Sequence, residues 1–236
     1  MGFAIWVSFQ LIFGVRTRFA SNRVTRRVSV GWKTNLVIID QLLDEATVLK
    51  ALGREGYSYL DQLKGEDLFP SNDFVMGAHN GCTIIGDSDL ADAFTTDYES
   101  AETQSLVTRL GGSRVVACVL HSVVNLAAFS LFNHGRLERA YACATDDGVF
   151  VDEGEMLECE KRVYAEYGKK TLEDGSVVFF DDHDEFDQSS LGEDVVFELL
   201  ATVLGKRPDM DDDLFEIDIQ RYAGRTRGFF SKLFGG

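Results

Sequence analysis

The adjacent residues His121 and Ser122 are the pair best suited to chemistry, because a histidine can act as the base for a serine nucleophile. They directly follow an almost continuous apolar run over residues 115–120, which predicts a strand covered on both faces. Successive side chains of a strand point to opposite faces, so these two cannot easily hydrogen-bond each other. A structural histidine bonded to backbone is therefore the favoured interpretation, and a ligand-binding or catalytic role is the alternative.

A second candidate nucleophile is Ser88, in the segment Gly86-Asp87-Ser88-Asp89-Leu90. The segment is similar to the Gly-Asp-Ser-Leu motif of one class of serine esterases, with Asp89 inserted before the leucine. The later motifs of that class do not follow, and Phe180 stands three residues before His183, where the esterases have an aspartate. We expect Asp87 and its neighbours to cap the next helix, and a Ser88 hydrolase is the alternative.

An acidic run follows the apolar residues 177–180 and could bind a hard cation through its oxygens. It lacks the alternating ligands and the central glycine of an EF-hand loop, so a solvated loop is the favoured interpretation. The same interpretation applies to the acids of residues 209–213. The candidate metal ligands are Asp181, Asp182, His183 and Asp184, with Glu185 and Asp187 in the same run.

The four cysteines predict buried, reduced thiols and hence a reducing compartment, because none lies in a Cys-x-x-Cys pair. No two Cys or His residues have the spacing of zinc ligands. The sequence also has no phosphate-binding loop, dinucleotide fingerprint or zinc-protease motif, so we expect no cofactor. The cysteines are Cys82, Cys118, Cys143 and Cys159.

Apolar periodicity predicts the elements that would position these residues. Asn80-Gly81 and Gly135 predict tight hairpin turns. Helices are expected at residues 45–52, 57–63, 97–110 and 191–204, the last capped by Ser189 or Ser190. Strands are expected at residues 36–39, 74–76, 82–85, 115–120, 123–132, 137–143, 149–151 and 177–180, with an edge strand at 214–219. The pattern predicts an α+β fold with a mainly antiparallel central sheet and flanking helices.

Charge divides the 236 residues into three parts. Residues 1–29 hold five arginines and no acid, residues 221–236 hold four basic residues and no acid, and residues 30–220 carry a net charge of -25. We expect a basic N-terminal extension, an acidic domain and a basic aromatic tail. The extension has three interpretations: a start codon assigned too early, with Val30 as the true initiator; an organelle transit peptide; or an amphipathic arm on the domain.

Several segments together resemble a family of uncharacterised bacterial domains, known mainly from actinobacteria and without an assigned function. The resemblance covers residues 31–220 and is best over residues 114–151. Because family members begin near the first matching segment, it also favours Val30 as the initiator. It implies no mechanism. The matching segments are Gly31–Asp40, Arg114–Val116, His121–Val124, Ala128-Phe129, Gly135–Leu137, Leu191–Glu193 and Arg207–Asp209.

The net charge of -16 disfavours nucleic acid and anionic membranes as partners, and no apolar segment is long enough to span a bilayer. We expect a non-enzymatic, acidic interaction domain of the bacterial cytoplasm that binds a basic protein, for example as an immunity-type inhibitor of a toxin. The alternative is a small hydrolase or metal-dependent enzyme that uses Ser88, His121 or the acids of residues 181–187.

Overall fold

The structure is a computed structural model that describes residues 32–68, 73–122, 124–145, 147–173, 175 and 177–224. The expected N-terminal extension and the alternative start at Val30 lie outside the described residues, as do residues 225–236 of the expected tail. Residues 221–224 belong to the last strand of the sheet.

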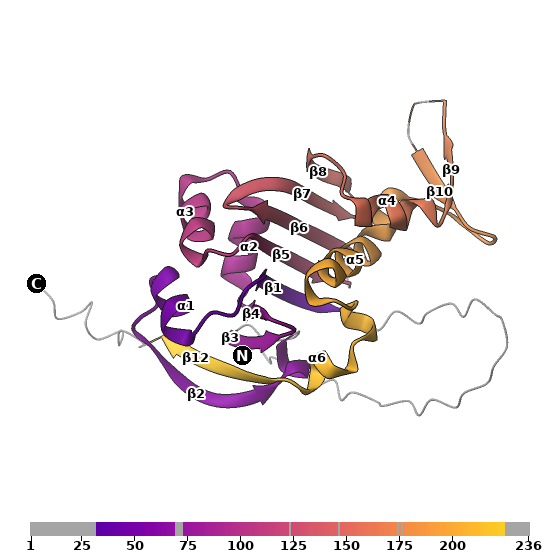
Figure 1. Ribbon diagram of the computed structural model, residues 1–236. Coiled ribbons are helices and arrows are strands. Elements are labelled where there is room, and N and C mark those ends of the chain that lie inside the picture. The colour runs from indigo at the N-terminus through magenta and orange to yellow at the C-terminus, as the bar shows by residue number, and fades with distance from the viewer. Residues whose placement is uncertain are drawn as a thin grey trace, which may run out of the picture. The chain divides into compact units, whose positions relative to one another are not determined.

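Nine strands form one antiparallel sheet, in the order β2-β12-β3-β4-β1-β5-β6-β7-β8 (Figure 1). The four strands β5 to β8 follow one another as an antiparallel meander. The strands are β1 (Lys33–Ile39), β2 (Tyr57–Lys64), β3 (Phe74–His79), β4 (Cys82–Gly86), β5 (Arg114–His121), β6 (Leu126–Asn133), β7 (Arg136–Ala144), β8 (Gly148–Gly154) and β12 (Asp218–Gly224).

Helices cover both faces of this sheet (Figure 1). On one face lie α1 (Glu45–Ala51), α2 (Ser88–Thr96) and α3 (Ala101–Leu110), and on the other α4 (Glu158–Ala165), α5 (Gly192–Leu204) and α6 (Asp212–Glu216). Alternate residues of β1 supply the two cores: Leu36 and Ile38 face α5, whereas Val37 and Ile39 face α2. The predicted α+β class, with a mainly antiparallel sheet and flanking helices, is confirmed.

A second sheet of three short strands follows α4 in the chain (Figure 1). Its strands are β9 (Gly168–Thr171), β10 (Val177–Phe180) and β11 (Glu185–Asp187). Phe179 joins it to the main core by packing against Tyr164 of α4, with the ring centroids 5.4 Å apart.

The strongest local signals in the sequence are confirmed. Residues 115–120 are all buried, as expected for a strand covered on both faces. The hairpin turns at Asn80-Gly81 and His134-Gly135 have positive φ at both positions, which is the geometry that the Asn-Gly and Gly signals favour.

Other element predictions are wrong. Residues 57–63 form strand β2 rather than a helix, because they pair with β12 along their length. The edge strand expected at 214–219 is instead the end of α6 followed by β12, which lies inside the sheet between β2 and β3. The helix expected at 97–110 begins at residue 101, after a separate helix α2. Neither Ser189 nor Ser190 is the N-cap of α5; both lie in a 3-10 turn, Gln188–Leu191, before it.

A buried arginine joins β7, β8 and α4. The guanidinium of Arg139 is 1% exposed, and its Nη2 and Nε donate to Glu160 Oε1 at 2.8 Å and Oε2 at 3.0 Å. Its Nη1 donates to the backbone oxygen of Gly154 at 3.1 Å and pairs with Asp152 at 2.6 Å. Glu160, which is fully buried, also accepts from the Leu157 amide at the start of α4. All three guanidinium nitrogens and both carboxylate oxygens thus have hydrogen-bond partners, which makes a buried charge pair tolerable.

Replacement of Arg139 by Met should destabilise the fold by about 3–5 kcal/mol, because it leaves the Glu160 carboxylate buried without a counter-charge. Urea unfolding followed by circular dichroism measures this loss. The control is Lys161→Ala, which removes an exposed pair with Glu158 and should change stability little. Equal losses in the two variants would contradict a structural role for the Arg139–Glu160 pair.

Gly154 should tolerate alanine poorly, because a Cβ there would lie 2.2 Å from the backbone oxygen of Glu138. Gly148 is a matched control: its φ is also positive, at 68° against 85° for Gly154, but a Cβ there meets nothing within 4 Å. Gly148→Ala should cost about 1–2 kcal/mol from the left-handed backbone alone, and Gly154→Ala clearly more. Equal unfolding midpoints for the two variants would disagree with the close approach of β8 to β7.

Candidate functional site

The sequence candidates lie on three different parts of the fold. Ser122 and His121 lie at the end of β5, Ser88 is the first residue of α2, and Asp181 to Asp184 form the turn between β10 and β11. Of these, Ser122 lines a hollow together with residues from other elements. That hollow is the candidate site.

The hollow lies where the β5–β6 turn and the end of β7 meet the start of α5. Its volume is about 210 Å³, and most of its lining side chains are polar. The lining residues are Ser122, Asn125, Leu126, Ala127, Thr145, Ser189, Ser190 and Glu193.

Ser122 connects three parts of the chain through one hydroxyl. Its Oγ accepts from the Trp32 amide at 2.6 Å and lies 2.9 Å from the Trp32 carbonyl and 3.0 Å from Glu193 Oε2. A hydroxyl has one proton to donate, so the two oxygens share it. The indole of Trp32 in turn packs edge-on against Phe197 of α5, 5.1 Å between centroids. Ser122 therefore acts as a junction between β5, the segment before β1 and α5.

Glu193 is the acidic group of the hollow and lies in the first turn of α5. Burial raises the pKa of its carboxyl, the hydrogen bond from Ser122 lowers it in part, and the charges of Asp194 and Asp209 raise it again. The start of the helix is held against the sheet by Gly192, where a Cβ would lie 2.6 Å from Cys143 Sγ and 2.7 Å from Ala127 Cβ. The backbone that carries Glu193 is thus closely packed against the sheet, and the carboxylate itself is bonded by Ser122.

His121 lies on the other side of β5 from Ser122. In that strand Leu120 belongs to the core under α5 and Val119 to the core under α2, so the alternation places His121 on the α2 side. Its Nδ1 is buried and has no hydrogen-bond partner among the described residues. The two side chains do not form a pair, as strand geometry predicted.

Ser88 and its neighbours form the start of a helix. Asp87 is the N-cap of α2, accepts from the Leu90 amide at 2.7 Å and pairs with Arg54 at 2.5 Å. The Arg54 guanidinium lies over the ring of Phe74, 4.9 Å from its centroid. These contacts give Asp87 a capping role of the kind expected from the sequence.

The acidic run of residues 181–187 uses its carboxylates within the chain. Asp181 Oδ1 accepts from the amides of His183 and Asp184, both at 2.8 Å, and Asp187 Oδ1 accepts from the Ser189 amide at 2.7 Å. Lys170 pairs with Glu185. In the part of the chain that the structure describes, no group of three or more His, Cys, Asp or Glu side chains could hold a metal ion.

Three polar residues form a cluster near the ends of α5 and α6, and one of them, Asp211, is 1% exposed, so the expectation of a solvated loop over residues 209–213 is wrong for this acid. His79 Nε2 lies 2.9 Å from Asp211 Oδ2, and Lys206 lies 3.4 Å from Asp211 Oδ1. Burial acts to raise the pKa of Asp211. The hydrogen bond and charge of His79 and the charge of Lys206 outweigh burial and hold this pKa below its ordinary value. This triad joins the β3–β4 hairpin to the turn before α6, residues that are 132 apart in the chain.

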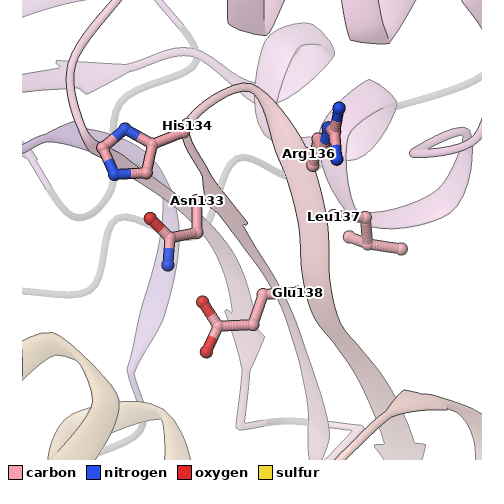
Figure 2. Close-up of a pocket in the computed structure, with 5 residues that line it drawn as sticks. All are labelled: Asn133, His134, Arg136, Leu137 and Glu138. Carbon is pink, nitrogen blue, oxygen red and sulfur yellow. The ribbon is translucent and has the colours of Figure 1, made fainter.

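A larger, shallower hollow of about 510 Å³ lies at the β6–β7 hairpin, lined by Asn133, His134, Arg136, Leu137 and Glu138. Figure 2 shows these side chains fanning out to both sides of one hairpin instead of converging. Four of them are exposed, all but Leu137. A hairpin tip of this kind lacks the enclosure that a binding site needs.

The four cysteines are free and buried, and burial raises the pKa of the Cys118 thiol to about 12. Thiols in such surroundings are inert as nucleophiles. Among the described residues, no helix is both long and apolar enough to cross a bilayer.

Comparison with known proteins gives one match. Residues 61–222 match a family described as a family of unknown function (DUF6928). No curated protein and no solved structure matches the chain.

The raised pKa of Glu193 predicts how the stability of the fold depends on pH. A carboxyl whose pKa is higher in the native state than its ordinary 4.5 favours the fold in its protonated form. This contribution is complete below pH 4.5 and is lost as the pH rises through the native-state pKa. Glu193→Gln should therefore gain stability relative to the parent chain as the pH rises.

Ser122→Ala should raise the pKa of Glu193 further, because it removes the hydrogen bond that lowers it. NMR titration of the Glu193 Cδ measures this pKa, and an unchanged or lower value would contradict the Ser122–Glu193 bond.

Proposed function

The chain belongs to this family of unknown function, and from the distribution of charge over its surface we propose that it is a non-enzymatic, acidic interaction domain that binds a basic protein. The observation that carries the proposal is an acidic segment on and between α2 and α3, whose five exposed acids form no ion pair with a described residue. The proposed setting is the reducing bacterial cytoplasm, which the four free, buried cysteines support.

The basic residues of the described domain are few and several are already paired. Residues 32–224 contain 39 Asp and Glu but only 15 Lys and Arg. Arg207, for example, binds Asp194 at 2.6 Å, Glu198 at 3.1 Å and Asp209 at 2.9 Å. Arg221 likewise binds Asp61 and Asp73. The excess of acid is thus left on the surface.

One stretch with an excess of acid covers α2 and the start of α3. Residues 87–102 contain six acids and no Lys or Arg. Five of the six are exposed, and we call them the α2–α3 acidic segment: Asp89, Asp92, Asp97, Glu99 and Glu102. None of these five forms an ion pair with a described residue.

Titratable groups in this segment respond to its negative potential. Burial and then the charge of Asp89 raise the pKa of Asp92. Burial, then Glu153 of β8 and Glu99, raise the pKa of Tyr98 between the two helices. Glu153 therefore adds to the same negative region from the neighbouring edge of the sheet.

A surface of this kind favours a partner with clustered Lys or Arg. Complementary charge speeds diffusional encounter and selects the partner, and both effects weaken as salt screens the charges. An immunity-type inhibitor of a basic toxin is one concrete form of this function. The two hydrogen bonds between Ser122 Oγ and the backbone of Trp32 support a structural role for this hydroxyl.

The proposal is tested with proteins that co-purify with the full chain from the cells that express it. A partner bound through the acidic segment should be basic, should bind at low salt and should be released at high salt. The variant Asp92→Asn/Asp97→Asn/Glu99→Gln/Glu102→Gln should slow association with that partner roughly tenfold in stopped-flow measurements.

The matched control is Glu66→Gln/Glu166→Gln/Asp182→Asn/Asp212→Asn, which removes four exposed acids from other elements. It changes the net charge equally and should slow association much less. Equal slowing in the two variants would reject the segment as the binding surface. Failure to recover a salt-sensitive basic partner would reject the function.

A further inference from the structure

We propose that the hollow at the start of α5 is a binding site for a primary ammonium or guanidinium group, with the Glu193 carboxylate as its counter-charge. The hollow lies on the α5 face of the sheet, whereas the α2–α3 acidic segment lies on the opposite face. The inference therefore stands apart from the proposed function.

The size of the hollow fits a side chain. Pockets for drug-sized ligands have volumes of roughly 300–1,000 Å³. At about 210 Å³ this hollow is smaller, but it exceeds the share of several water molecules, roughly 30 Å³ each. A short alkyl chain with a charged end is the natural occupant.

The carboxylate in the hollow favours a cation as the ligand. Glu193 is half-buried and forms no ion pair with a described residue. The positive charge of Arg207 acts to lower the pKa of Glu193, but Asp194, Glu198 and Asp209 already bind that guanidinium. Burial removes water from this carboxylate and raises its pKa, and Asp194 and Asp209 act in the same direction. A bound cation would supply the missing compensation.

The helix start does not favour an anion instead. Amide groups at a helix N-terminus attract negative charge. Here Glu193 and Asp194 of the first turn already provide it. A second anion would be repelled by both carboxylates, so a cationic ligand is favoured.

The remaining walls match both ends of such a ligand. An ammonium has three donors and a guanidinium five, and the hydroxyl and amide oxygens of the lining residues are acceptors. Ser189 donates its own proton to Asp187, which leaves its lone pairs available. Leu126 and Ala127 offer apolar surface to the alkyl chain. The close packing at Gly192 keeps the backbone that carries the carboxylate in position before a ligand arrives.

The test is a ¹⁵N NMR titration of the full chain with n-butylammonium, n-butylguanidinium and, as the neutral control, n-butanol. The cations should shift the amide signals of Ser122, Asn125, Thr145 and Glu193 saturably, and n-butanol should not. Glu193→Gln keeps an oxygen that accepts from Ser122, so it should fold but weaken cation binding at least tenfold. Glu166→Gln, which neutralises an exposed acid after α4, should bind like the parent chain.

Three results would overturn the proposal: no saturable shift at these residues with either cation, equal shifts with n-butanol, or unchanged cation binding in Glu193→Gln. The variant with four substitutions in the α2–α3 acidic segment separates the two proposals. It should bind the cations normally even if it loses the protein partner, and a parallel loss of cation binding would count against a separate site.

Discussion

The centre of the sheet is apolar on both faces, because alternate residues of β1 and β5 enter two different cores. In β5, Val116, Cys118 and Leu120 face α5, whereas Val115, Ala117 and Val119 face α2. Such a sheet is stable only if both faces are covered, and six helices in two layers provide the cover (Figure 1). Apart from the buried Arg139–Glu160 pair, the polar sites described above lie at the ends of the strands and on the outer sides of the helices. The Ser122–Glu193 hollow lies at a strand end, and the α2–α3 acidic segment lies on an outer side.

The two edges of the sheet are poor candidates for binding because both are bulged. In β2, Asp61 faces Arg221 and Tyr59 faces Tyr222, which leaves Leu60 unpaired and 53% exposed. In β8, Val151 faces Ala142 and Val149 faces Cys143, which leaves Phe150 unpaired and 54% exposed. Bulges bend an edge strand and interrupt its hydrogen-bonding ladder, so addition of another strand is hindered. Exposed apolar residues here follow from the bulges and need no partner.

Features encoded within a few residues were predicted from the sequence. Features that depend on pairing with a strand far along the chain were not. The apolar run of β5 and the turns at Asn80-Gly81 and Gly135 are encoded within a few residues and were predicted. In β2, apolar Tyr57, Leu60 and Leu63 have helical spacing, but pairing with β12, about 160 residues later, makes the segment a strand. The site shows the same limit: Ser122 was singled out for its neighbour His121, yet its hydroxyl bonds Glu193, 71 residues away, and the backbone of Trp32, 90 residues away.

The way the chain uses its arginines connects stability with surface charge. Arg54, Arg139, Arg207 and Arg221 each bind acids that belong to other elements or to the ends of helices, so they act as internal clamps. Arg139, Arg207 and Arg221 each bind two or more carboxylates with a single positive charge, so negative charge remains around them. With 15 basic residues against 39 acids in residues 32–224, the fold therefore leaves negative charge uncompensated elsewhere. Uncompensated charge lies on the surface in the α2–α3 acidic segment and inside the hollow at Glu193. Arg207 does not neutralise Glu193, because three other carboxylates already bind it. The arrangement that stabilises the fold thus also leaves negative charge at the two places where we propose that a cation from another molecule binds.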